Sequence, residues 1–408
     1  MGKTRPPERS KLAKKQKKQT ADAKRKAAQA PSQLLAQAAI HLQQSDVESA
    51  LQLATSALQQ LKKTLKTEQD VFNCLPALSL LGEINVELGD IDAARDYFGQ
   101  AAQIDEDGDL PEQAGGGADK FLWLAQLSEE GGKDSVMWFE KGAAVLRRQI
   151  TAAIEEGMDQ DTQALLLEEK KSKLSNALCA IAEVYMTDLS WDDKTAEEVC
   201  DRVVKEALEI SPNNPEILQT VASVRISQLK VDEAKAYLQK SLDLWMDLPE
   251  DSPQVPDFPV RISLARLLME AEMEEQALEV VERLIQEDDH SVEAWYLGGW
   301  CLHLLAEKQK PAANGASNGK AAVNTTEQQE LQKRARRWLL RCLKIFETLE
   351  YEDEKLQEHA EELIASLNEV LGEPDENELD VDSGAEDEWE GIDTSDEESG
   401  SGDEEMEG

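Results

Sequence analysis

The feature of this sequence that most constrains its fold is a fixed spacing of twelve residues between small side chains, which occurs four times. In each case an apolar segment ends in Ala or Gly, and Ala follows twelve residues later, then two more apolar or small residues at intervals of four and three. A chain of this kind can form antiparallel helix pairs whose small residues meet where the two helices cross. The spaced residues are Ala38 and Ala50, Gly82 and Ala94, Ala222 and Ala234, and Ala265 and Ala277.

Three further segments carry the pattern in a weaker form, at 121–142, 178–207 and 294–342. The first has a shortened turn at Gly131-Gly132, the second an insertion around Trp191, and the third a long insert. Helix pairs of about 34 residues with this pattern are typical of tetratricopeptide repeats. We therefore predict an all-α fold, a right-handed tetratricopeptide superhelix of about seven helix pairs with a concave inner face. A generic bundle or HEAT-like array has no fixed spacing of this kind.

Composition divides the chain into three parts. Residues 1–30 form a basic tail that we expect to be disordered, and residues 372–408 form an acidic, disordered tail. Between them, residues 31–371 form the repeat superhelix, which ends in a capping helix over 352–371. The segment 308–326 is rich in Ala, Asn and Gly and lacks apolar periodicity, so we expect a flexible insert there.

The net charge of −41 is unevenly distributed. Residues 1–30 contain 11 basic and 2 acidic residues, whereas 372–408 contain 18 acidic residues and no basic one. The repeat region holds 64 acidic and 32 basic residues, so it is acidic without the tail. Such a field attracts basic proteins and repels nucleic acids and anionic membranes. We expect no direct nucleic-acid binding by the repeat region.

Nothing in the sequence indicates an enzyme, a cofactor or a metal site. The phosphate loop, the HExxH and GxSxG motifs and the Rossmann glycine pattern do not occur, and the four His are dispersed. The five Cys form no CxxC pair and fall on apolar helical positions, so we predict buried thiols in a reducing compartment. No apolar stretch approaches the roughly 20 residues of a membrane span.

The binding site is expected on the first helix (helix A) of each pair, because certain helix A positions usually face the groove in tetratricopeptide proteins. Lys, Arg and Asn at these positions bind acidic chaperone tails in one subclass, but here the positions carry acidic and apolar residues, which favours a Lys/Arg-rich partner. For any single Glu, a solvated helix face is an equally simple interpretation. The candidates are Glu83, Glu87, Leu122, Gln126, Glu129, Glu130, Glu183, Met186, Glu216, Gln219, Met269, Glu270, Trp295, Leu302 and His303.

Both tails have possible roles of their own. The basic start KLAKKQKKQTADAKRKAA is compatible with a nuclear-import signal read by an import receptor, a nucleic-acid arm, or a cover for the acidic groove. In the acidic tail, four hydroxyl residues each precede an acidic residue by three positions, the pattern that casein-kinase-type enzymes accept. These candidate phosphorylation sites are Ser383, Thr394, Ser395 and Ser401.

The chain as a whole resembles the fungal assembly chaperones dedicated to large-subunit ribosomal protein L-four. The likeness rests on the basic start, the segments SALQLATSALQQLKK and LLGEINVELGDIDAARDYFGQAAQID, and the ending DEWEGI. It implies a protein that captures the newly made ribosomal protein, shields its long basic internal loop and escorts it from the cytoplasm into the nucleus. Alternatives are a chaperone of histones or other basic nuclear cargo, a scaffold in a larger complex, and an RNA-binding solenoid.

Overall fold

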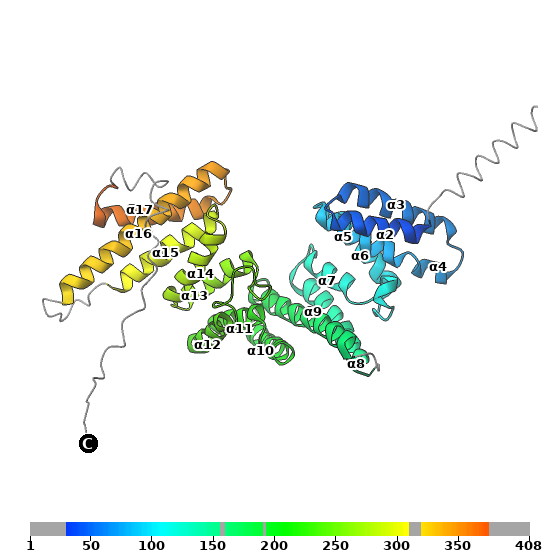
Figure 1. Ribbon diagram of the computed structural model, residues 1–408. Helices are drawn as coiled ribbons and strands as arrows, with labels where there is room; N and C mark the ends of the chain where they lie inside the picture. The colour runs from blue at the N-terminus through cyan, green and yellow to red at the C-terminus, as the bar shows by residue number, and fades with distance from the viewer. Residues whose placement is uncertain (1–29, 156–159, 191–192, 310–319, 375–408) are drawn as a thin grey trace, which may run out of the picture. The chain divides into compact units, whose positions relative to one another are not determined.

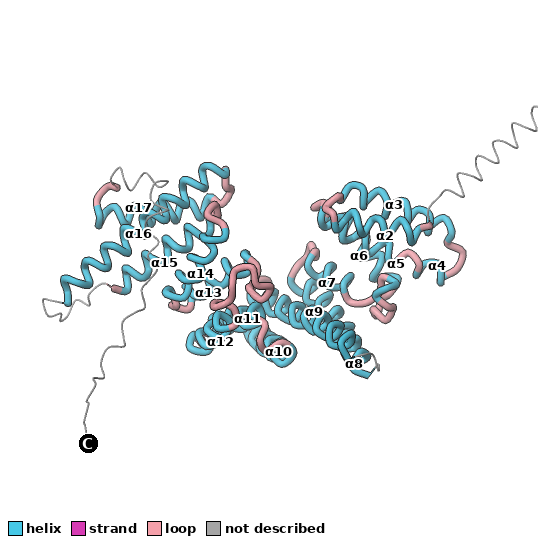
Figure 2. The backbone as a smooth tube through the Cα atoms, viewed as in Figure 1, coloured by secondary structure: helices cyan, strands magenta, loops and turns pink. Residues whose placement is uncertain are grey.

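The computed structural model describes residues 30–155, 160–190, 193–309 and 320–374, and in these ranges every regular element is a helix (Figure 1, Figure 2). This confirms the all-α prediction. The chain forms two compact units, residues 1–229 and 230–408. The division falls inside the fifth predicted helix pair. The N-terminal segment 1–29 and the candidate phosphorylation sites lie outside the described residues.

Unit 1 consists of consecutive antiparallel helices, most of which match the predicted pairs. A short helix α4 follows the first pair, and the 3-10 helix η1 lies between the second and third pairs. The elements are α2 (Pro31–Gln43), α3 (Val47–Thr64), α4 (Glu68–Phe72), α5 (Leu75–Glu87), α6 (Ile91–Ile104), η1 (Glu112–Ala114), α7 (Asp119–Gln126), α8 (Gly132–Glu155), α9 (Gln160–Met186), α10 (Asp193–Ile210) and α11 (Pro215–Ser227).

The pair α5–α6 shows why small residues occupy the crossing points. Gly82 of α5 lies directly over the ring of Phe98, and a Cβ atom added at Gly82 would come within 2.5 Å of ring carbons. Phe98 is 1% exposed, and Ala94 and Ala101 on the same face of α6 are fully buried. Because interiors are close-packed, a larger residue at position 82 would force the two helices apart.

The turn between the helices of a regular pair has one backbone conformation throughout. Ser45, Gly89, Leu229 and Glu272 have φ of 60°, 73°, 60° and 57°, and each lies seven residues after the spaced small residue of its helix A. This left-handed conformation ends helix A and frees the chain to turn back. Only one of the four is Gly, so the turn itself gives almost no sequence signal.

The connection between α6 and α7 is fixed by a buried ion pair. Lys120 Nζ lies 2.8 Å from Asp105 Oδ2, and the two side chains are 1% and 4% exposed. Lys120 also donates to the carbonyl of Gly117 at 2.6 Å. At the edge of the same connection, Lys170 of α9 lies 2.6 Å from Glu112. These contacts tie helices A of neighbouring pairs together.

Unit 2 continues the alternation of helices and ends in the predicted capping helix. Before α13, the buried Trp245 is covered by Arg283, which donates to the carbonyls of Met246 at 2.5 Å and Leu248 at 3.0 Å. The elements are α12 (Val231–Asp243), α13 (Phe258–Glu270), α14 (Glu274–Glu287), α15 (Val292–Lys308), α16 (Lys320–Leu349) and α17 (Glu354–Leu371).

Helices lie at both ends of the predicted flexible insert 308–326. Helix α15 runs to Lys308, and helix α16 already begins at Lys320. Residues 320–326 contain Ala and Lys, which favour helix, and once the packed part of α16 has formed, extending it costs little. Residues 310–319 lie outside the described part of the chain.

Candidate functional site

The A helices of unit 1 carry two groups of acidic residues, one around Glu83 and one around Glu183. Lys173 Nζ of α9 is 3.0 Å from Asp119 Oδ1 of α7. The charge of Asp119 raises the pKa of Glu83 of α5, and the charge of Lys173 lowers it. In the second group, the charges of Glu183 of α9 and Glu216 of α11 both raise the pKa of the Cys179 thiol. We call Glu83, Asp119, Glu183 and Glu216 the acidic face. It carries four carboxylates against the single ammonium of Lys173 that the same contacts place there.

The acidic face is held in a partly dehydrated setting. Burial raises the pKa of Glu83, the Asp119 carboxylate adds to this shift, and Lys173 opposes it. Loss of water around Glu183 raises the pKa of that carboxyl too, although the residue keeps an exposed surface. Carboxylates in such a setting gain more from an arriving cation than fully solvated ones do. The face is therefore suited to binding Lys or Arg side chains.

The third helix pair departs from the predicted helix A positions. Helix α7 has only eight residues and ends at Gln126, so Glu129 and Glu130 lie in the following turn rather than on helix A. Glu129 lies 3.1 Å from Arg95 of α6. Leu122 lies on α7 as predicted and packs against Gly142 of α8, where an added Cβ would come within 2.5 Å of the Leu122 side chain. The shortened turn at Gly131-Gly132 begins helix α8 early and leaves no room for a longer α7.

The remaining predicted residues of unit 1 have different exposures. Glu87 and Gln126 are exposed at the ends of α5 and α7, and Met186, the last residue of α9, is partly buried. Gln219 of α11 is only 5% exposed, so it offers almost no surface to a partner. Sequence reasoning missed Asp119, because it is the first residue of the short α7.

Unit 2 contains a groove of about 530 Å³ between helices α13, α15 and α17. Its aromatic wall is formed by Tyr296 and Trp300, and both contact His359 behind it: Tyr296 Oη lies 2.7 Å from His359 Nδ1, and the Trp300 and His359 rings meet edge to face at 5.0 Å. We call this the aromatic groove. It is lined by Arg266, Met269, Glu270, Tyr296, Leu297, Trp300, Leu304, Asp353, Lys355 and Leu356.

Helix α15 packs against α16 through both of its consecutive Gly residues. A Cβ at Gly298 would come within 2.2 Å of the Trp338 ring, and a Cβ at Gly299 within 2.6 Å of Leu339 Cγ. Leu302 of the same helix is fully buried, so its prediction as a surface residue is wrong. Trp295 stacks edge to face on Trp338 and donates to the carbonyl of Asp289 at 2.8 Å, outside the groove lining.

Two of the predicted unit 2 residues, Met269 and Glu270, do line the aromatic groove, although Met269 is only 7% exposed. The predicted His303 is partly buried on α15 and is not among the lining residues. The groove residues that sequence reasoning missed are chiefly Tyr296, Trp300 and Arg266.

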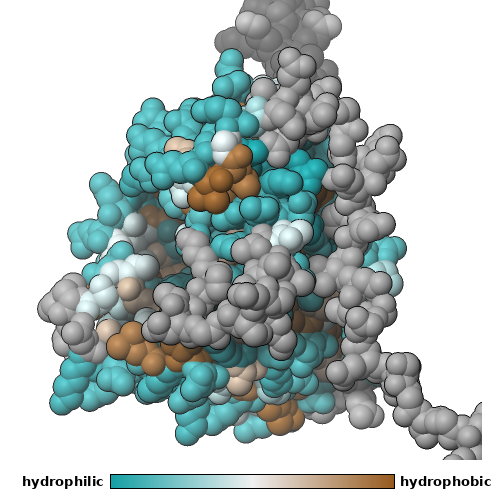
Figure 3. Space-filling view, turned by 90° about the vertical axis from the view of Figure 1, so that its left-hand side faces the viewer, coloured by the Kyte–Doolittle hydropathy of each residue, from teal (hydrophilic) through white to brown (hydrophobic). Residues whose placement is uncertain are grey.

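Other chemistry is sparse in the described residues. All five Cys are free and buried, and burial raises the pKa of Cys179, Cys301 and Cys342 to about 12, so these thiols are unreactive at neutral pH. One exposed group, Asp288, Asp289 and His290, has metal-ligand spacing. Within the described ranges no helix is both long and apolar enough to cross a membrane. On the face shown in Figure 3, apolar patches are small and separate.

Comparison with known proteins agrees with the repeat fold and decides the family. A tetratricopeptide repeat model matches residues 75–107, which contain the pair α5–α6. A protein of Emericella nidulans named "Probable assembly chaperone of rpl4" is 44% identical over 402 residues, covering 97% of this chain and 98% of the relative. The chain belongs to the family of rpl4 assembly chaperones.

Two further members of the rpl4 assembly chaperone family extend this result. A Schizosaccharomyces pombe protein of the same name is 36% identical over 303 residues, covering 74% of this chain and 82% of the relative. The solved structure of residues 1–338 of the assembly chaperone of RpL4 (Acl4) is 50% identical, with a TM-score of 0.65, and the match covers 70% of this chain and 99% of that one. The resemblance inferred from the sequence motifs is thus confirmed.

Proposed function

We propose that this chain is a dedicated, non-enzymatic chaperone that binds ribosomal protein L-four (RpL4) through a basic segment laid along the acidic face of unit 1. The observation that carries the proposal is the presence of two groups of carboxylates on successive A helices, Glu83 with Asp119 and Glu183 with Glu216. Family membership supports the identity of the partner, and these carboxylates offer a means of binding it.

A Lys/Arg-rich segment binds RNA non-specifically wherever it meets it, since each neutralised phosphate releases counterions. Carboxylates on neighbouring helices occupy the same cations and keep the segment from RNA until RNA and assembled neighbours compete for it. Such a chaperone would hold its partner in the cytoplasm and release it in the nucleus. It needs no catalytic group and no cofactor.

The direct test is a charge reversal on the acidic face of the full chain. The variant E83K/E183K/E216K is expected to weaken binding of RpL4 at least about a hundredfold, since like charges at an interface cost several kcal/mol and 1.4 kcal/mol is tenfold. Binding would be measured by titration calorimetry. Circular dichroism and thermal melting would verify that the variant is folded.

A matched control reverses three exposed acidic residues on B helices, in the variant D96K/E155K/E209K, which has the same net charge. It is expected to bind RpL4 within about threefold of wild type. Equal losses in the two variants would mean that only net charge matters and would refute the acidic face as the site. Recovery of histones instead of RpL4 from cell extract would favour the alternative basic cargo.

A further inference from the structure

The aromatic groove of unit 2 has an apolar base and a dehydrated wall. Met269, Leu297 and Leu356 line it and are 7%, 0% and 5% exposed. Burial raises the pKa of the Tyr296 hydroxyl in the wall. The volume of about 530 Å³ lies within the range of about 300–1,000 Å³ that is typical of ligand clefts. The groove therefore has the size and the surface to accept an apolar side chain of a partner.

The wall of the groove is held in place from behind. Tyr296 and Trp300 lie four residues apart on α15, so they share one side of the helix, and their rings are tilted by 41° at a centroid distance of 5.8 Å. His359 of α17 meets both rings edge to face, at 5.8 and 5.0 Å. Rings fixed in this way lose little freedom when a ligand arrives, which favours binding.

The charged residues that line the groove are balanced in sign. Arg266 and Glu270 come from α13, and Asp353 and Lys355 come from the start of α17, in a chain whose net charge is −41. Arg266 is paired with Glu293 at 2.8 Å. An arriving Lys or Arg would meet two bases as well as two acids, so the groove gains little from a cation. An uncharged side chain matches the groove better.

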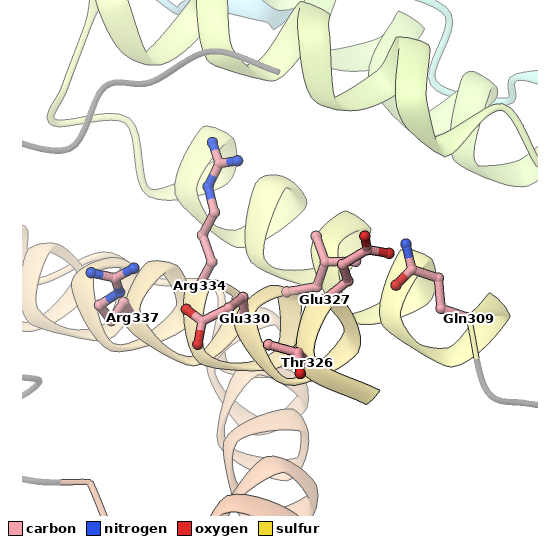
Figure 4. Close-up of a pocket in the computed structure, with 7 residues that line it drawn as sticks. Gln309, Thr326, Glu327, Glu330, Arg334 and Arg337 are labelled. Atoms are coloured by element: carbon pink, nitrogen blue, oxygen red, sulfur yellow. The ribbon is translucent and has the colours of Figure 1, made fainter. Parts of the chain in front are cut away.

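A second hollow of unit 2, of about 450 Å³, has a different character (Figure 4). Arg334 of α16 is held there by Glu282 of α14 at 2.6 Å and lies over the Trp338 ring. Six of the seven lining residues are polar or charged, which favours solvent over an apolar ligand. They are Gln309, Thr326, Glu327, Glu330, Leu331, Arg334 and Arg337. Of these two hollows, the aromatic groove is the one suited to an apolar side chain.

We propose that the aromatic groove binds one aromatic side chain of an extended segment of RpL4, as a contact separate from the acidic face. This contact rests on the proposed function, which supplies the partner. Tyr296 and Trp300 present ring faces and edges, and aromatic rings prefer offset-stacked or edge-to-face contacts. Binding at the groove buries apolar surface and should depend little on salt, whereas binding at the acidic face should weaken as salt rises.

Titration calorimetry of RpL4 with the full chain separates the two contacts when it is done at about 0.15 M and at about 1 M salt, where screening reaches about 3 Å. W300A is expected to weaken binding at least about tenfold at both salt concentrations, as for the loss of one central aromatic contact. The matched control W295A removes a ring of the same helix outside the groove lining and should bind within about threefold of wild type.

Because W300A also removes a contact with His359, a second measurement keeps the ring in place. The full chain is labelled with 5-fluorotryptophan, and the Trp300 and Trp295 resonances are identified by their loss in W300F and W295F. The fluorine resonance of Trp300 should shift when RpL4 is added at either salt concentration, and that of Trp295 should stay.

The outcomes distinguish the groove from the acidic face. An unshifted Trp300 resonance with RpL4 bound, or equal losses of affinity in W300A and W295A, would overturn the groove contact and leave the acidic face standing. A shifted Trp300 resonance together with undiminished binding by E83K/E183K/E216K at the lower salt concentration would refute the acidic face alone.

Discussion

The buried pair Lys120–Asp105 gives the sharpest test of how the acidic face is supported. The substitution D105A leaves the Lys120 ammonium, which is 1% exposed, hydrogen-bonded to the Gly117 carbonyl but without a carboxylate partner at position 105. Removing one partner of a buried pair costs about 3–5 kcal/mol. For a unit of about 200 residues, each kcal/mol lowers the melting temperature by about 2–4 °C, so we expect a decrease of roughly 6–20 °C.

The dependence of this variant on pH follows from the same pair. Burial lowers the pKa of Lys120, while Asp105 opposes the shift. Because the folded pKa lies below the unfolded value, the unfolded state binds more protons, and stability rises with pH up to about 10.5. Without Asp105 the pKa should fall further, so the melting temperature of D105A should rise more steeply between pH 7 and 10 than that of wild type.

Thermal melting of the full chain, followed by circular dichroism, would measure both effects. The double variant D105L/K120M should recover most of the lost stability, since apolar residues can replace a buried ion pair. The control D109A breaks the exposed pair Asp109–Arg148 in the same connection, where the side chains are 73% and 52% exposed, and should cost under about 1 kcal/mol. A loss in D105A no larger than in D109A would refute the reasoning.

Three further predictions test other parts of the molecule. L302K should cost at least about 3 kcal/mol in denaturant unfolding, because the side chain is fully buried; a change within about 0.5 kcal/mol would restore its surface assignment. Y296F removes the 2.7 Å contact with His359 and should lower the free energy of unfolding by about 1 kcal/mol. An unchanged free energy of unfolding would refute the hydrogen bond. Because the pKa values of Glu83 and Glu183 are raised, affinity for RpL4 should weaken as pH falls from 7 towards 5, and E83Q/E183Q should bind more weakly at pH 7 with a flatter profile. An unchanged profile in that variant would exclude these two acids.

Glu83 and Glu183 lie on helix A in both the prediction and the structure, because each directly follows a small residue of the repeat, Gly82 or Ala182. Burial raises the pKa of both carboxyls. The predicted helix A positions were wrong where the length of the helix changed. Helix α7 stops after eight residues, and no local signal before Gly131 marks that end clearly.

The class of fold, the helix pairs and the overall charge follow from the sequence, because they depend on local periodicity and composition. The sequence could not say which side chains of α15 are covered, since this helix is apolar over most of its surface. In the folded chain both Gly298 and Gly299 meet α16, at Trp338 and Leu339. Leu302 is fully buried, whereas Tyr296 and Trp300 line the aromatic groove. Packing between helices, which no single segment encodes, makes this difference.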